Sequence, residues 1–426
     1  MKKVSKLLSM MLVLAILLTI TISSASAADV VLRGMHWNSS TVEHERYQKT
    51  FDAFMEANPN IDIQFEWFPT GFAEKLVALF ADGSAPDFFA TYVGDLGQRV
   101  SAGFIQPITD RFNAENFNMD DLLDSAVIRY GEDIYSVLAA VTPQVLFYNK
   151  NMFDAAGVPY PTDEWTWADM LEAAKKLTIK DGDKVIQYGF QCDEYCRVWL
   201  SKFWSDGGKC FDNEDNPTKS TYNDAIGAEA AQYLLDLVQN FGVAPPPGIP
   251  GALGYREVFT NSGVAMVLDG SWMTAQYDKA EGFDLGVSLV PMGKVKRGGW
   301  MAPTGMMMSA TTQHPDEVWQ FLKYFCGYEN SIYFGGYGDT GTMAGVPVWR
   351  SAYTDSRWKA GEISETIRRQ AEGAPVEMKW QGYGTWFWNY LNVGLQEMVM
   401  SGGDPVAMLN SVAEKTDAEV LPEIER

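Results

Sequence analysis

The sequence is rich in tryptophan, a residue whose flat ring can stack on the weakly polar C–H face of a sugar. Several of its 14 tryptophans stand at the expected ends of strands or starts of helices. A sugar also needs planar amides, carboxylates or arginine, because its hydroxyl groups lose hydration on binding and must be paired again. The chain contains the residue types for both tasks. The leading candidates for stacking are Trp37, Trp272, Trp300 and Trp386.

The sequence contains no motif that indicates catalysis. Glycoside hydrolysis needs two carboxylates at a fixed separation, and the 55 acidic residues supply many pairs without a motif that selects one. The three histidines, His36, His44 and His314, form no H-E-x-x-H, and no G-x-S-x-G occurs. Residues 336–341 read G-x-G-x-x-G but stand far from the first strand–helix unit, so we interpret them as a loop. We therefore expect a protein that is not an enzyme.

Cysteines and acids give no metal or cofactor signature. Three of the four cysteines, Cys192, Cys196 and Cys210, lie in one short segment, and Cys326 is remote. In an exported protein a local bridge from Cys192 or Cys196 to Cys210 is open, and the sequence does not choose the pairing. The segment lacks the histidine that a zinc site could use, and residues 211–220 lack the closing glutamate of a calcium loop. No cofactor is expected.

The N-terminus has the pattern of a cleaved signal peptide. Residues 1–27 carry three lysines, an apolar core and a final Ala-Ser-Ala, which predicts cleavage before Ala28. No cysteine follows the apolar core, so a lipid anchor is not expected. The formal net charge of −22 argues against nucleic acid or an anionic membrane as a partner, because both require basic patches. The length of the remaining chain favours two lobes.

The elements that would position the candidate residues can be placed from periodicity. A strand at 29–37, a helix at 42–58, a strand at 61–67 and a helix at 72–80 form a βαβ beginning of an α/β lobe. Trp37 falls in a loop at the carboxyl end of the first strand, where α/β folds bind ligands. A buried strand is expected at 145–148 and an amphipathic helix after Thr166, whose hydroxyl can cap it.

Three stretches together carry a family resemblance. Residues 141–177 read VTPQVLFYNKNMFDAAGVPYPTDEWTWADMLEAAKKL, residues 81–108 contain APDFFATYVGDLGQRVSAGFIQPI, and residues 263–272 read GVAMVLDGSW. In this order they resemble the extracellular solute-binding proteins of bacterial ABC sugar importers, the maltose-binding-like branch of the periplasmic binding proteins. The resemblance extends over nearly all of the chain after the signal peptide.

The resemblance implies a type II periplasmic-binding-protein fold, with two α/β lobes joined by hinge crossings and a ligand cleft between them. It places residues 28–141 and about 300–350 in the N-terminal lobe. Residues 142–299 and about 351–426 then form the C-terminal lobe.

The resemblance also implies polar ligand-binding residues beside the tryptophans. Trp272 matches a stacking residue of the maltose-binding branch, and either Trp380 or Trp388 could occupy the place given to Trp386. Thr142 and Gln144 stand at the first hinge crossing. The complete polar set comprises Asn38, Tyr92, Asp95, Thr142 and Gln144.

The implied function is that of a periplasmic receptor, expected to be monomeric, which delivers a sugar to the transmembrane subunits of an ABC permease. The aromatic content favours an oligosaccharide. Two rival hypotheses are a secreted glycoside hydrolase and a binding protein for another solute such as a polyamine.

Overall fold

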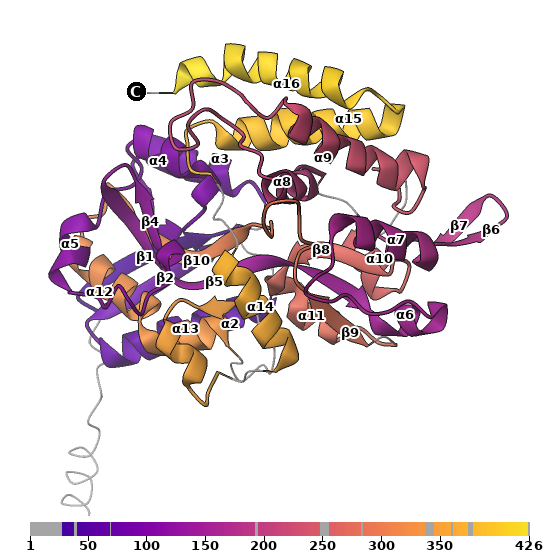
Figure 1. Ribbon diagram of the computed structural model, residues 1–426. Helices are drawn as coiled ribbons and strands as arrows, with labels where there is room; N and C mark the ends of the chain where they lie inside the picture. Colours follow the sequence, from indigo (N-terminus) through magenta and orange to yellow (C-terminus); the bar gives the residue numbers. More distant parts are fainter. Residues whose placement is uncertain are drawn as a thin grey trace, which may run out of the picture.

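The computed structural model describes residues 28–424 apart from 38–40, 69, 192–194, 248–254, 283, 337–344, 359–360 and 374–377. The signal peptide prediction lies outside this part of the chain. The described residues form two α/β lobes that share a nine-stranded mixed sheet (Figure 1). None of the helices in the described part is long and apolar enough to cross a membrane.

The first lobe is built on the βαβ unit expected from the sequence. Its opening elements are β1 (Val30–His36), α2 (Thr41–Ala57), β2 (Ile61–Trp67), α3 (Phe72–Ala81), β3 (Phe88–Ala90) and α4 (Leu96–Ser101). β1 pairs in parallel with β2 and β3, and the register places His36 opposite Trp67. The predicted bounds of these strands and helices are confirmed to within a residue or two.

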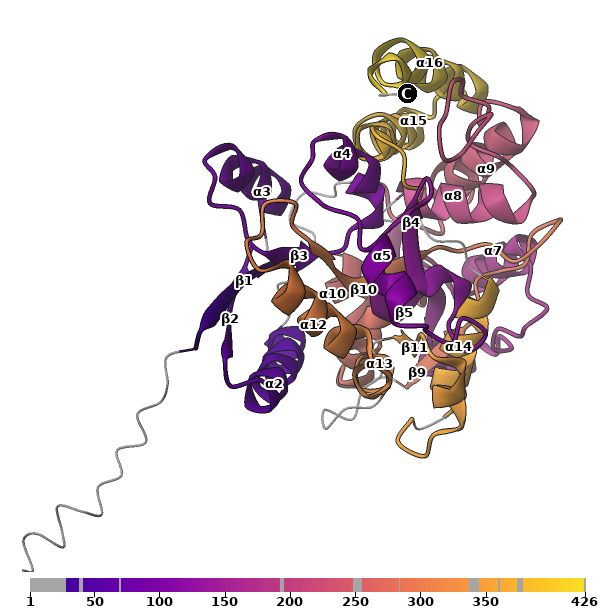
Figure 2. The same ribbon diagram turned by 90° about the vertical axis from the view of Figure 1, so that its left-hand side faces the viewer.

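Later segments join this sheet or pack against it. They are α5 (Thr109–Ala114), β4 (Val127–Tyr130), β10 (Met301–Met308), α12 (Pro315–Cys326), α13 (Tyr328–Gly335) and β11 (Val346–Pro347). β10 runs antiparallel to β3 and so adds a strand from far along the chain to the sheet. Figure 2 shows α3 and α4 on one side of this sheet and α2, α12 and α13 on the other.

One strand, β5 (Asp133–Asn149), runs through both lobes. Its first half pairs with β4, β10 and β11. Its second half pairs with β8 (Met266–Gly270) and β9 (Leu285–Ser288) of the second lobe. The buried strand predicted at 145–148 is therefore the end of a 17-residue strand. The sequence pattern missed the earlier part because small and polar residues interrupt the apolar run there.

The remaining elements are mainly helices. The elements that follow β5 are α6 (Lys150–Ala156), α7 (Trp167–Leu177), β6 (Ile179–Asp181), β7 (Lys184–Gln187), α8 (Tyr195–Ser205), α9 (Ala225–Leu235), α10 (Tyr255–Thr260) and α11 (Thr274–Asp278). The C-terminal elements are α14 (Glu362–Gly373), η6 (Thr385–Asn392), α15 (Val393–Ser401) and α16 (Pro405–Glu419). Thr166 caps α7 as predicted, in a reciprocal capping box with Asp169.

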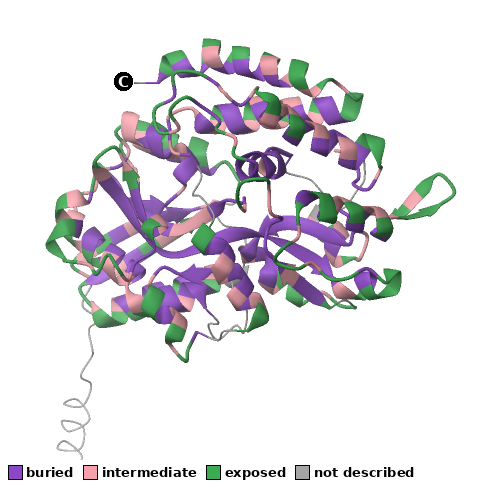
Figure 3. Cartoon of the chain, in the orientation of Figure 1, coloured by how far each residue is buried: buried purple, intermediate pink, exposed green. Residues whose placement is uncertain are grey.

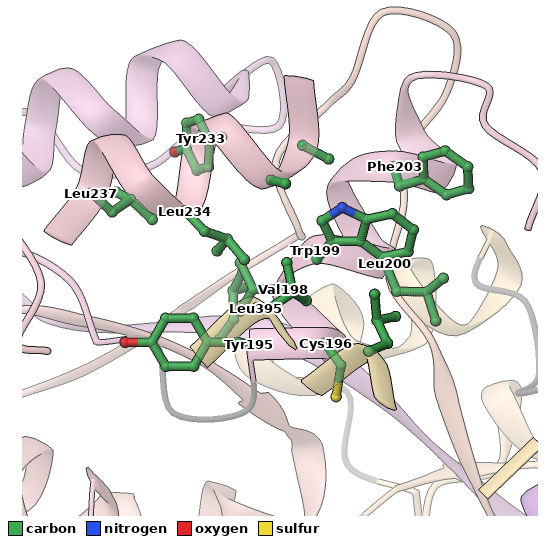
Figure 4. Close-up of a cluster of buried hydrophobic side chains, with 14 of the residues drawn as sticks. Tyr195, Cys196, Val198, Trp199, Leu200, Phe203, Tyr233, Leu234, Leu237 and Leu395 are labelled. Atoms are coloured by element: carbon green, nitrogen blue, oxygen red, sulfur yellow. The ribbon is translucent and has the colours of Figure 1, made fainter. Parts of the chain in front are cut away.

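Helix α8 forms the centre of the second lobe. Figure 3 shows it almost entirely buried, and every residue of α8 except Arg197 is buried. Its apolar side chains meet those of α9 and α15 (Figure 4), and Trp199 stacks on Phe203 with ring centroids 4.6 Å apart. The Trp199 indole N–H donates to the Gly227 carbonyl at 3.0 Å. Lys202 is also inside, where it pairs with the buried Asp206 at 2.7 Å.

Asp269 fixes the end of β8. Its buried carboxylate accepts hydrogen bonds from Arg256 at 2.8 and 3.0 Å, from the Tyr277 hydroxyl at 2.7 Å and from the Gly270 backbone N–H at 2.7 Å. We predict that Asp269→Ala lowers the free energy of unfolding by about 3 kcal/mol, because it leaves the Arg256 charge without this partner. Urea unfolding followed by circular dichroism measures the change.

Asp284→Ala is the matched control. Its carboxylate is mostly exposed and lies 3.5 Å from Lys150, so its loss should cost less than about 1 kcal/mol. Equal losses for the two variants would contradict the role given to Asp269.

Candidate functional site

The site begins where β1 and β3 end. Trp37 follows β1, and Tyr92 follows β3. Their rings meet edge to face with centroids 5.7 Å apart, and both are half-buried. Trp37 also lies edge to face on Phe72 of α3 at 5.5 Å. The first lobe thus presents two aromatic rings at the carboxyl edge of its parallel strands, which is where α/β folds place ligands.

Tyr92 connects this pair to the C-terminal segment. The indole N–H of Trp388, in η6, donates to the Tyr92 hydroxyl at 3.3 Å. Close beside it, the Gly97 N–H of α4 donates to the Lys379 carbonyl at 2.8 Å. A Cβ on Gly97 would lie 2.4 Å from the Gln381 nitrogen, so only glycine allows this approach of two backbones. Residues far apart in the chain are therefore held together at the candidate site.

Arg197 extends the site into the second lobe. Its guanidinium lies over the Trp300 ring, 3.6 Å from the centroid, and 5.1 Å from the centroid of Trp388. Such contacts are favourable because the ring face carries negative charge. Arg197 is also the one residue of α8 that is not buried. The otherwise buried helix α8 thus contacts Trp300 and Trp388 through the side chain of Arg197.

Trp272 lies beyond Trp300, with ring centroids 5.5 Å apart. It follows β8 in a short 3₁₀ turn, at the helix start that the sequence predicted. Its ring covers the Gly270 backbone so closely that a Cβ there would lie 1.9 Å from a ring carbon. We call the continuous set formed by Trp37, Tyr92, Trp388, Arg197, Trp300 and Trp272 the aromatic seam.

Asp95 lies near this seam and has a raised pKa. Its carboxylate is 3.7 Å from Arg99, which is buried and also donates to the Ala90 carbonyl at 3.0 Å. Burial raises the pKa of Asp95 above its ordinary value, and the nearby Arg99 charge opposes that rise. The pair gives the first lobe a carboxylate that can accept from a hydroxyl group without adding a full isolated charge.

Thr142 and Gln144 occupy the part of β5 where its partners change. The Thr142 hydroxyl donates to the Ala302 carbonyl at 3.1 Å, and Gln144 accepts from the Ser201 hydroxyl at 2.5 Å. The Gln144 backbone N–H donates to the Trp300 carbonyl at 2.8 Å. Both side chains are buried. They tie β5 to α8 and to the strand after Trp300, so their direct contact with a ligand stays a prediction.

Two of the predicted stacking residues have buried rings. Trp386 is 0% exposed and packs among Phe211, Tyr222 and Tyr383, so the stacking role given to it stays a prediction, whereas Trp388 is half-buried. Trp300 is 2% exposed and supports Arg197 from beneath. Asn38 lies outside the described residues.

Arg197 is the residue that sequence reasoning missed. It stands in YCRVWLSKFWS, where Lys202 is the other basic residue. The two are equivalent in type, yet one reaches the seam and the other forms a buried ion pair. Arg197 and Lys202 differ in the direction that each side chain faces, and the packing of α8 sets that direction.

The described residues contain no group of three or more histidine, cysteine or acidic side chains placed to hold a metal. In the 211–220 turn, Asp212 instead accepts from the backbone N–H groups of Thr218 and Lys219 at 2.9 and 3.0 Å. Cys210 carries a free, buried thiol, so the local bridge to Cys210 is not formed. Cys326 is likewise a free, buried thiol, and Cys192 lies outside the described residues. The G-x-G-x-x-G motif falls almost wholly outside them too.

Two α/β lobes with aromatic and polar residues gathered between them define the class of two-lobed solute-binding proteins. Residues 38–330 match the family described as bacterial extracellular solute-binding protein. The chain belongs to this family, and the resemblance seen in its sequence is confirmed.

Relatives with assigned names extend over much of the chain. A putative binding protein of Brucella abortus is 24% identical over 423 residues, 93% of this chain and 94% of that protein. The galactooligosaccharide-binding protein of Bacillus subtilis is 21% identical over 385 residues, 87% and 86% of the two chains. The arabinooligosaccharide-binding protein of Halalkalibacterium halodurans is 25% identical over 266 residues, 58% and 56%.

Solved structures confirm the two-lobed fold. An ABC substrate-binding protein from Listeria monocytogenes in complex with cycloalternan superimposes with a TM-score of 0.81 at 20% identity, covering 91% of this chain and 98% of that one. A receptor of Streptomyces glaucescens, solved without ligand and with acarbose, gives 0.78 at 21% identity, covering 93% and 99%.

Because the Trp272 ring lies so close to Gly270, a larger residue at position 270 should move it. Gly270→Ala should displace the indole, and we expect a changed near-UV circular dichroism spectrum with the far-UV spectrum retained. The control is Gly373→Ala at the end of α14, where an added Cβ meets nothing within 4 Å. A near-UV spectrum of Gly270→Ala that matches wild type would contradict the tight seating of Trp272.

Proposed function

We propose that the protein is the substrate-binding component of an ABC carbohydrate importer, and that it binds an oligosaccharide along the aromatic seam. The observation that carries the proposal is the continuity of the seam. Trp37 and Tyr92 come from the first lobe, and Arg197 and Trp272 come from the second. A ligand that touches both groups of residues favours the arrangement in which the lobes are closed.

The chemistry of the seam suits a sugar. Half-buried tryptophan rings offer faces for its C–H groups, and guanidinium, phenol and carboxylate groups pair with its hydroxyls. The names of the relatives support the same substrate class, since two of them bind arabinooligosaccharides and galactooligosaccharides.

The rival hypotheses fit the seam less well. A polyamine would be repelled by Arg197, which lies at the middle of the seam over Trp300. A glycoside hydrolase needs two carboxyl groups facing one bond. Asp95 is the acidic residue that we place beside the seam, and it is paired with Arg99.

The change of partners along β5 supports a division of the chain between lobes. We assign residues 28–141 and about 300–350 to the N-terminal lobe, and 142–299 with about 351–426 to the C-terminal lobe. The permease subunits would recognise the closed pair of lobes, and we expect the receptor to be a monomer.

The proposal also includes export of the protein. We infer that the signal peptide is cleaved before Ala28 and that the mature protein is a free periplasmic receptor without a lipid anchor. The intact mass of protein recovered from the periplasmic fraction should equal that of residues 28–426. A mass that retains residues 1–27, or one increased by lipid, would refute this inference.

A ligand screen tests the function itself. We expect arabino-, galacto- or malto-oligosaccharides, but not polyamines or amino acids, to raise the melting temperature of the mature protein. A ligand at one hundred times its Kd adds about 2.7 kcal/mol to the stability of the folded state. Chromatography after long incubation should recover the saccharide unchanged. A shift with polyamines alone, or consumption of the sugar, would reject the proposal.

Two tryptophan variants localise the binding. Trp388→Ala removes a seam ring together with its hydrogen bond to Tyr92, and it should weaken saccharide binding about tenfold or more in calorimetry. Trp165→Ala removes a half-buried indole that packs near Phe153 and is not one of the seam residues, and it should leave the Kd unchanged. Equal effects would place the ligand elsewhere.

A further inference from the structure

The aromatic seam does not end at Trp37. The His36 ring lies 4.6 Å from Trp37 and 5.5 Å from Trp67, measured between ring centroids. His44, in the first turns of α2, stacks on Trp67 at 3.9 Å with an interplanar angle of 24°. Aromatic rings therefore continue outward across the ends of β1 and β2.

The inner member of this extension is a supporting residue. His36 is buried, and its Nε2 lies 3.3 Å from the Tyr47 hydroxyl. Burial lowers the pKa of His36 to about 3, with a further lowering by His44, so its imidazole is neutral near neutral pH. A neutral, buried ring therefore lies against both Trp37 and Trp67.

The outer members of this extension are only partly buried. Trp67 and His44 are both half-buried, whereas the aromatic residues beneath them, Tyr47 and Phe51, are 1% exposed. Trp67 also lies directly opposite His36 in the parallel register of β1 and β2. The stacked pair thus stands at the same carboxyl edge of the sheet as Trp37.

We propose that Trp67 and His44 form an outer subsite that receives the distal sugar units of an oligosaccharide whose inner units lie on the aromatic seam. The indole and imidazole offer ring faces for sugar C–H groups. This inference rests on the proposed carbohydrate function and adds a preference for length. Short saccharides fill the seam, and longer ones also reach the outer pair.

The test is the dependence of affinity on chain length. Calorimetry is performed with arabino-, galacto- and malto-oligosaccharides of two to six units on wild type, Trp67→Ala and His44→Ala. For the series that binds, we expect wild-type affinity to rise with length. Each variant should weaken the longest ligand about threefold to tenfold and change disaccharide binding less than twofold.

The controls separate this inference from the function on which it rests. Trp165→Ala should keep the wild-type dependence on length. If Trp67→Ala disturbs folding, His44→Ala still gives the answer, because it leaves the indole in place. A uniform loss at all lengths, or no loss at any length, overturns the outer subsite while the receptor function stands. Failure of wild type to bind any saccharide overturns both.

Discussion

The two lobes depend on a single strand that changes its partners midway. Backbone groups of β5 pair with β10 up to Pro143 and with β8 from Gln144 onward. The backbone N–H and C=O groups of each half of β5 pair with strands of a different lobe. The two lobes are therefore joined at β5 without a separate linker and without a long stretch of unpaired backbone. Thr142 and Gln144 then hold this joint through side-chain hydrogen bonds. The joint between the lobes is therefore part of the sheet itself.

Local physics made much of the fold predictable. The βαβ beginning, the Thr166 cap and the helix start at Trp272 follow from periodicity and capping, which neighbouring residues determine. Trp386 and Trp388 both lie in η6, a π-helical stretch. The i→i+5 pattern rotates side chains out of α-helical phase, so the sequence could not tell whether Trp386 or Trp388 faces outward. Arg197 was missed because packing of α8, and not residue type, decides its direction.

The seam combines rigidity with polar groups that are partly desolvated. Trp300 and His36 are buried rings; Trp300 packs against Arg197, and His36 packs against Trp37 and Trp67. Gly270 permits the indole of Trp272 to lie directly on the backbone. Side chains that are already ordered lose little conformational entropy when a ligand binds, and a smaller entropic cost gives a higher affinity.

Helix α8 also has a consequence for how the protein can diverge. Ten of its eleven positions are buried, and Arg197 alone is open to replacement without disturbing the packing around Trp199. Exchanging that one side chain for an amide, an acid or another ring would change what the middle of the seam recognises while the lobe stays intact. A change at this position would therefore alter the seam while the ten buried residues of α8 stay the same.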